Sequence, residues 1–101
     1  MNGNLQPISL RNLKMPRVFI PPLLRQRVGG TESVVVPGNS VRQVIAALDA
    51  QFPGLGEALC DGESLRAGLA VVVDGDVTPM GLLQKVTPAS EIHFLPAISG
   101  G

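Results

Sequence analysis

One amphipathic helical segment near the middle of the chain limits how the rest can fold. Its large apolar side chains recur at the spacing of one helix face, i, i+3, i+4, i+7 and i+11. They are Val41, Val44, Ile45, Leu48 and Phe52. Ser40 and Gln43 match a capping box at the beginning of this helix, and Pro53-Gly54 ends it. A single apolar stripe of this kind can be buried by packing against a sheet, and the remaining segments carry strand patterns.

Two β-branched segments precede the helix. Residues 17–20 are predicted as a first strand, and Pro21-Pro22 should limit its pairing to an edge or a bulge. Residues 23–27 lead to Gly29-Gly30, a turn with the φ freedom that a hairpin needs. Residues 32–36 are β-branched and are predicted as the return strand.

The segments after the helix are shorter. Residues 55–67 are predicted as a loop or short turn, and residues 69–73 are too short and too β-branched for a helix. Asp74-Gly75 is a strong hairpin signal, with residues 76–79 as a short return arm. Leu82 and Leu83 are expected in a short helical turn or a covering loop.

The last strand, residues 91–95, is apolar enough to lie in the centre of a sheet. Alternation places Ile92 and Phe94 inward, and Glu91, His93 and Leu95 outward. The order strand, strand, helix, strand, short strand, strand predicts an α+β fold with one main helix packed across a mixed sheet. This is the arrangement of a β-grasp, or ubiquitin-like, domain, assigned here to residues 15–98.

Composition narrows the class of function. The chain has 101 residues, 45% of them hydrophobic and 16% charged, which predicts one folded domain. Eight basic and eight acidic residues and only three aromatics favour neither nucleic acid nor an anionic membrane as a partner. The single cysteine, Cys60, excludes an intrachain disulfide and indicates a reducing compartment, so a cytoplasmic location is expected.

Residues 1–14 differ from the rest of the chain. They are polar and basic with no sustained pattern, which predicts a loose N-terminal extension and leaves Met1 and Met15 as alternative starts. The segment lacks a continuous apolar core and a small-residue cleavage site, so no signal peptide is expected.

Catalytic and metal-binding patterns are missing from the sequence. With one histidine and one cysteine, neither a His/Cys metal cluster nor an oriented Cys-His pair can be assembled. Cys60 is expected to be packed or partly exposed in a loop without a cationic neighbour, and Asp61, Asp74 and Asp76 are expected to be turn residues. We therefore predict no catalytic residue, no metal site and no cofactor bound by this chain.

The C-terminal residues are the remaining functional candidate. Pro96 restricts the arm, Ala97 and Ile98 are apolar, and Ser99 leads to Gly100-Gly101. Glycines without Cβ atoms can carry a terminal carboxylate through a narrow channel, although a frayed end is the simpler interpretation. Ile98 is either an isolated exposed side chain or an anchor in a partner's groove. His93 is either a solvated surface group or a partner contact.

The strand-strand-helix order followed by residues 94–101, Phe-Leu-Pro-Ala-Ile-Ser-Gly-Gly, resembles the MoaD/ThiS sulfur-carrier family from about Met15 to Gly101. Residues 22–25, 28–30, 52–55 and 95–98 look closest to the carriers of cysteine synthesis. Pro96-Ala97 stands where molybdopterin synthase small subunits often have two prolines, which makes them the second choice.

The resemblance implies that partner enzymes supply the chemistry. An E1-like enzyme would use ATP to adenylate Gly101, a sulfur donor would convert it to a thiocarboxylate, and a biosynthetic acceptor enzyme would take the sulfur. Gly101 is then the covalent site, with Gly100 as the steric requirement and Ser99 in the tail. Ile98, Leu95 and His93 are the candidate docking residues.

Two other functions use the same sequence features. A ubiquitin-like modifier would join Gly101 to lysines of other proteins through the same adenylate. A non-covalent β-grasp binding module would carry Gly100-Gly101 without using it, so its removal would change nothing.

Overall fold

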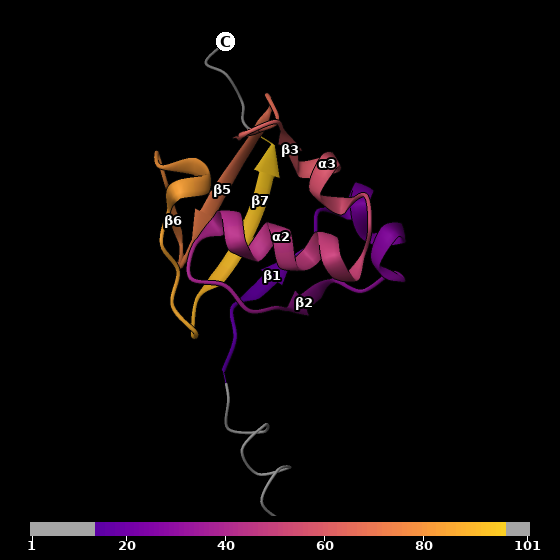
Figure 1. Ribbon diagram of the computed structural model, residues 1–101, viewed down its shortest axis with the longest axis horizontal. Helices are drawn as coiled ribbons and strands as arrows, with labels where there is room; N and C mark the ends of the chain where they lie inside the picture. The colour runs from indigo at the N-terminus through magenta and orange to yellow at the C-terminus, as the bar shows by residue number, and fades with distance from the viewer. Residues whose placement is uncertain (1–13, 97–101) are drawn as a thin grey trace, which may run out of the picture.

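The computed structural model describes residues 14–96 and has a five-stranded mixed sheet with one main helix, α2 (Val41–Gln51), packed across one face (Figure 1). The strand order is β2-β1-β7-β5-β6. The strands are β1 (Arg17–Phe19), β2 (Ser33–Val35), β5 (Leu69–Val73), β6 (Asp76–Val77) and β7 (Glu91–Pro96). β1 and β7 are parallel, and the other neighbours are antiparallel. This is the predicted β-grasp arrangement.

The last strand is central, as its apolar sequence predicted. β7 lies between β1 and β5, and Ile92 and Phe94 are buried on the side of α2. Glu91 and Leu95 are exposed and His93 is half-buried, which confirms the predicted alternation. The core is therefore formed between one face of the sheet and the apolar stripe of α2.

The predicted helix stripe and cap are present with one change. Val41, Val44, Ile45 and Leu48 are buried, and Phe52 packs partly buried against them. The Ser40 Oγ accepts a hydrogen bond from the Gln43 N–H at 3.2 Å. The Gln43 Oε1, however, accepts from the N–H of Asn39 at 2.8 Å rather than from that of Ser40. Both side chains thus pair backbone donors at the helix N-terminus.

The prediction that Pro21-Pro22 confine the first strand to an edge or a bulge was wrong. β1 ends at Phe19 and is paired on both sides, by β2 and by β7. The prolines instead precede and begin a 3-10 helix, η1 (Pro22–Val28), a position where a missing N–H costs little. Gly29 follows in the left-handed conformation with φ 71°, so the predicted glycine turn is the end of η1 within a longer β1–β2 connection.

The segment predicted as a loop at residues 55–67 contains ordered elements. They are a short helix, α3 (Leu55–Leu59), and a two-stranded ribbon of β3 (Cys60–Asp61) and β4 (Ser64–Leu65). Leu55 and Leu59 are buried one helical turn apart. A helix of five residues is too short to show a periodic sequence pattern, which is why the prediction missed it.

The predicted second hairpin is confirmed. Asp74 and Gly75 have positive φ angles of 52° and 89° and join β5 to the short strand β6. A second 3-10 helix, η2 (Gly81–Leu83), follows, with Leu82 buried and Leu83 exposed. Between residues 14 and 96, no helix combines the length and the apolar character that crossing a membrane requires.

Candidate functional site

The side of the sheet away from α2 carries the predicted docking residues of β7. Paired residues on neighbouring strands share a face, so the register places Phe19, Ala70, Val72 and Val77 on the same side as His93 and Leu95. We call these six residues the open face. They form one cross-strand row, Phe19-His93-Val72-Val77, and a second pair, Leu95 and Ala70. The exposed fractions of Val77 and Leu95 are 66% and 46%.

His93 is held in place by an aromatic neighbour. The ring centroids of Phe19 and His93 are 4.2 Å apart, and the ring planes differ by 4°. Both residues are half-buried, and Val72 flanks His93 from the other side. His93 is thus an outward residue, as predicted, but one with a fixed ring plane rather than a freely solvated group. Stacked rings offer a partner a flat, preformed contact area.

The end of β7 fixes where the C-terminal arm begins. Leu95 pairs with Ala70, and Pro96 pairs with Leu69 at the start of β5. The candidate tail residues Ile98, Ser99, Gly100 and Gly101 lie outside the residues that the structure describes, so their predicted roles stay predictions. The open face therefore adjoins the arm through Leu95, one residue before the end of the strand.

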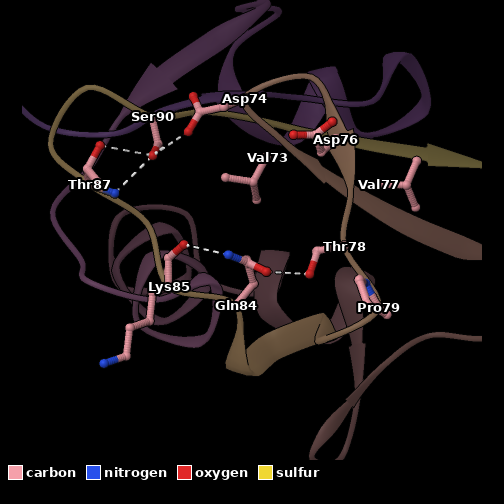
Figure 2. A pocket seen from close by; sticks show the side chains of 10 residues that line it. All are labelled: Val73, Asp74, Asp76, Val77, Thr78, Pro79, Gln84, Lys85, Thr87 and Ser90. Atoms are coloured by element: carbon pink, nitrogen blue, oxygen red, sulfur yellow. Dashed lines mark hydrogen bonds between the residues drawn. The ribbon is translucent and has the colours of Figure 1, made fainter.

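A pocket of about 350 Å³ lies at the opposite end of β7, where the strand begins (Figure 2). Several of its polar groups are bonded to one another. The Asp74 carboxylate accepts from the Ser90 Oγ–H and from the Glu91 N–H, both at 2.9 Å. The Thr87 N–H donates to the Ser90 Oγ at 2.9 Å. These bonds tie the β5–β6 turn to the loop before β7, so we interpret them as support for the central strand.

The sole cysteine has surroundings that the sequence did not reveal. Cys60 is half-buried in β3 against the core, rather than in a loop. Burial raises the pKa of its thiol, and the Arg42 and Arg66 guanidinium groups lower that pKa by less. The prediction that no cationic neighbour would be found was wrong, because both arginines are distant in sequence. Within residues 14–96 there is no group of three His, Cys, Asp or Glu side chains placed to hold a metal ion.

Phe19 is a member of the candidate site that was not predicted from the sequence. The parallel pairing of β1 with β7 brings Phe19 beside His93, although the two are far apart in the chain. Alternation in residues 17–20 could have indicated that Phe19 faces away from Val18. It could not have identified the neighbouring strand.

Comparison with known proteins gives the family. Residues 18–101, which end in the diglycine, match the ThiS family. The chain belongs to the ThiS family. It is 35% identical over 89 residues to the sulfur carrier protein CysO of Mycobacterium tuberculosis, which covers 83% of this chain and 96% of the relative. The predicted resemblance is therefore confirmed.

Two solved structures are similar to this ThiS-family chain over most of its length. One is a chain in the crystal structure of the BexX/CysO complex of Amycolatopsis orientalis, with a TM-score of 0.77, 30% identity, and coverage of 85% of this chain and 99% of that chain. The other is the crystal structure of Mycobacterium tuberculosis CysO, described as an antigen, with a TM-score of 0.75, 30% identity, and coverage of 82% and 99%. Both likenesses confirm the β-grasp fold.

Proposed function

We propose that this protein is a sulfur carrier whose C-terminal Gly101 holds the sulfur as a thiocarboxylate. The observation that carries the proposal is the family match, which runs through the last residue and so includes Gly100-Gly101. The relatives named CysO favour an acceptor enzyme of cysteine synthesis over one of molybdopterin synthesis. The cytoplasm, where such enzymes and ATP occur together, is the proposed location.

Chemistry at Gly101 requires activation, because a carboxylate is a poor acyl donor. A carboxylate oxygen attacks the α-phosphorus of ATP, pyrophosphate leaves, and an acyl adenylate forms. Sulfur at the oxidation level of sulfide, supplied by a donor as HS⁻, then attacks the acyl carbon and AMP leaves, so that C–S replaces C–O at the terminus. In this proposal an E1-like enzyme binds ATP and performs both steps, and a separate acceptor enzyme takes the sulfur. The carrier itself has no catalytic role and binds no cofactor.

Recognition by these enzymes is the task that we assign to the folded domain. Five residues follow Pro96, and five extended residues span at most about 18 Å. An active site that receives Gly101 must therefore lie close to the end of β7. The open face begins at that end with Leu95 and His93, and we propose that it docks against the enzymes, together with Ile98. Docking holds the terminus near the reacting groups, which replaces a bimolecular encounter by a local one.

The direct test is sulfur loading of the full-length protein and of a variant that lacks Gly101. Each would be incubated with its activating enzyme, ATP and a sulfur donor, and intact mass would be measured without reducing treatment. We expect the full-length protein to gain one sulfur in place of one oxygen at Gly101. The truncated protein should gain none, and Gly101→Ala should load more slowly because its methyl group obstructs the channel.

Thermal unfolding of the same proteins is the control, and it should not differ between them. Equal loading of truncated and full-length protein would contradict the proposal. Branched peptides that join Gly101 to lysines of other proteins, without any thiocarboxylate, would establish a modifier instead. If removal of Gly100-Gly101 changed neither loading nor partner binding, the chain would be a non-covalent binding module.

A further inference from the structure

The helix η1 exposes a leucine from a well-anchored segment. The exposed fraction of Leu23 is 94%, the highest among the exposed large hydrophobic residues of the described chain. Its neighbour Leu24 packs against the core, and Val28 at the other end of η1 is buried. Burying a leucine would stabilise a protein, and Leu23 forgoes that gain.

Hydrogen bonds hold η1 in this conformation. The Arg25 Nε–H donates to the carbonyl oxygen of Ile20 at 3.0 Å, and the Gly30 N–H donates to the carbonyl oxygen of Arg25 at 2.7 Å. The Leu24 N–H donates to the carbonyl oxygen of Pro21 at 2.8 Å. With both ends of η1 fixed, Leu23 projects from a preorganised turn, so a partner that buried it would not need to order a loose loop.

Two positively charged residues are close to this leucine in the sequence. Before Glu32 the chain has five basic side chains and no acidic one, and from Glu32 onward it has three basic and eight acidic side chains. Two of the basic residues, Arg25 and Arg27, are in η1 itself. The one salt bridge between residues 14 and 96 joins Arg42 to Glu63, so neither arginine of η1 is paired with a carboxylate there. The Arg27 guanidinium lies over Gly54, 3.3 Å from where a Cβ atom would be.

The position of η1 relates it to the C-terminal arm. η1 follows β1, and β1 runs parallel to the adjacent β7, so η1 begins at the end of the sheet where β7 also ends (Figure 1). Phe19 at the end of β1 and Leu95 near the end of β7 both belong to the open face, and η1 contacts α3 at this end of the sheet. A protein that docks at this end of the sheet and takes the arm can therefore extend onto η1.

We propose that Leu23, Arg25 and Arg27 form a second docking surface for an enzyme that receives the C-terminal arm. Its counterpart on the enzyme is an apolar pocket for Leu23, bordered by carboxylates that face the two arginines. Interface anchors are commonly buried side chains surrounded by contacts that exclude water, and opposite charges accelerate association. The proposal rests on the proposed function, because that function supplies the partner enzyme.

An anionic membrane is the other surface that would attract a leucine between arginines. Stable membrane binding requires a larger apolar face or a lipid anchor. η1 has seven residues, of which Leu24 and Val28 are already turned to the core. A single leucine therefore favours a pocket on a protein over a lipid surface.

The test measures the dissociation constants of the full-length protein for its activating enzyme and for its acceptor enzyme, at low and high salt. Leu23→Ser and Arg27→Gln are the test variants. Each has a matched control elsewhere: Leu83→Ser removes a leucine that is 65% exposed on the other 3-10 helix, and Lys85→Gln removes one exposed positive charge. We expect Leu23→Ser to weaken binding to at least one enzyme tenfold or more, and the controls to change it less than twofold.

Salt dependence and loading separate the outcomes. Arg27→Gln should weaken the same complex at low salt and approach the unmodified protein at high salt, since screening removes the charge attraction. Unchanged binding of both test variants, with normal sulfur loading of the unmodified protein, would overturn the second docking surface alone. Failure of the unmodified protein to load would overturn the proposed function and, with it, this partner. Co-sedimentation with vesicles of phosphatidylcholine and phosphatidylserine that depends on Leu23 would show a membrane surface and also overturn the proposal.

Discussion

At the scale of single residues, the burial of Cys60 makes the free energy of unfolding depend on pH. Burial raises the pKa of its thiol above the ordinary value of 9.0, and Arg42 and Arg66 offset only part of that rise. The folded chain therefore keeps this proton to a higher pH than the unfolded chain does. Between the two pKa values the unfolded state binds fewer protons, so the free energy of unfolding falls as pH rises. The protonated thiol makes its full contribution to the free energy of unfolding at pH values below its pKa in the unfolded chain. This contribution is lost as pH rises through its pKa in the folded chain.

This predicts that the urea midpoint of unfolding decreases between pH 8 and pH 10 by more in the unmodified protein than in Cys60→Ala. Both would be measured with a phosphine reductant to prevent oxidation. All other titratable groups are common to both proteins, so the difference between their pH dependences isolates the thiol. Parallel pH dependences would show that the thiol has the same pKa in the folded and unfolded chains.

At the scale of elements, the loop before α2 is packed against the helix at Gly38. A Cβ atom on Gly38 would lie 2.8 Å from both the Cγ2 and the backbone nitrogen of Val44, and the residue has a φ of 152°. We therefore expect Gly38→Ala to lower the free energy of unfolding by about 2–4 kcal/mol through overpacking and backbone strain. Gly62→Ala is the matched control, because Gly62 has a φ of 65° but no atom within 4 Å of its Cβ position.

The Gly62→Ala control separates the effect of overpacking from that of backbone strain. Gly62→Ala should lower the free energy of unfolding by about 1–2 kcal/mol, because only the left-handed backbone conformation is unfavourable for alanine there. Urea unfolding of the two variants side by side measures the difference. Equal losses at the two positions would mean that contact with Val44 adds nothing. In that case the loop moves away from α2 to accommodate the methyl group.

The elements that sequence analysis predicted well are those with local signals. The stripe of α2, the Asp74-Gly75 turn and the alternation of β7 each depend on residues within one segment. The interior position of β1 could not be predicted, because it depends on β7 from the other end of the chain. The proline rule failed there since the strand ends before Pro21.

In the candidate site too, features with a local sequence signal were predicted and features that depend on strand pairing were not. Alternation predicted that His93 and Leu95 face outward, and the register then added Phe19 and Val72 as their neighbours. Leu23 and Leu24 are adjacent leucines with no periodic context, so only the fold of η1 shows which of them is exposed. The roles of Gly100 and Gly101 still rest on sequence and family.

At the scale of the whole molecule, the covered and uncovered sides of the sheet have different tasks. α2 and the core occupy one side, and the open face leaves Leu95 and Val77 exposed on the other. Single exposed apolar residues are common, but these lie on paired strands around a fixed Phe19–His93 stack. If docking on this side delivers the arm, a change at Leu95 should affect affinity and leave the chemistry at Gly101 intact.

Leu95→Ser is therefore expected to raise the KM of the activating enzyme for the carrier about tenfold, with kcat unchanged, because the lost contact is present before and during the reaction. The free energy of unfolding should change by less than about 1 kcal/mol, since Leu95 is 46% exposed. Leu83→Ser, an exposed leucine on η2 beside α2, is the control and should leave both constants unchanged. A fall in kcat at constant KM would instead show that Leu95 orients the arm within the active site. The domain would then contribute to positioning Gly101 after docking, and the surface that determines affinity would have to lie elsewhere on the chain.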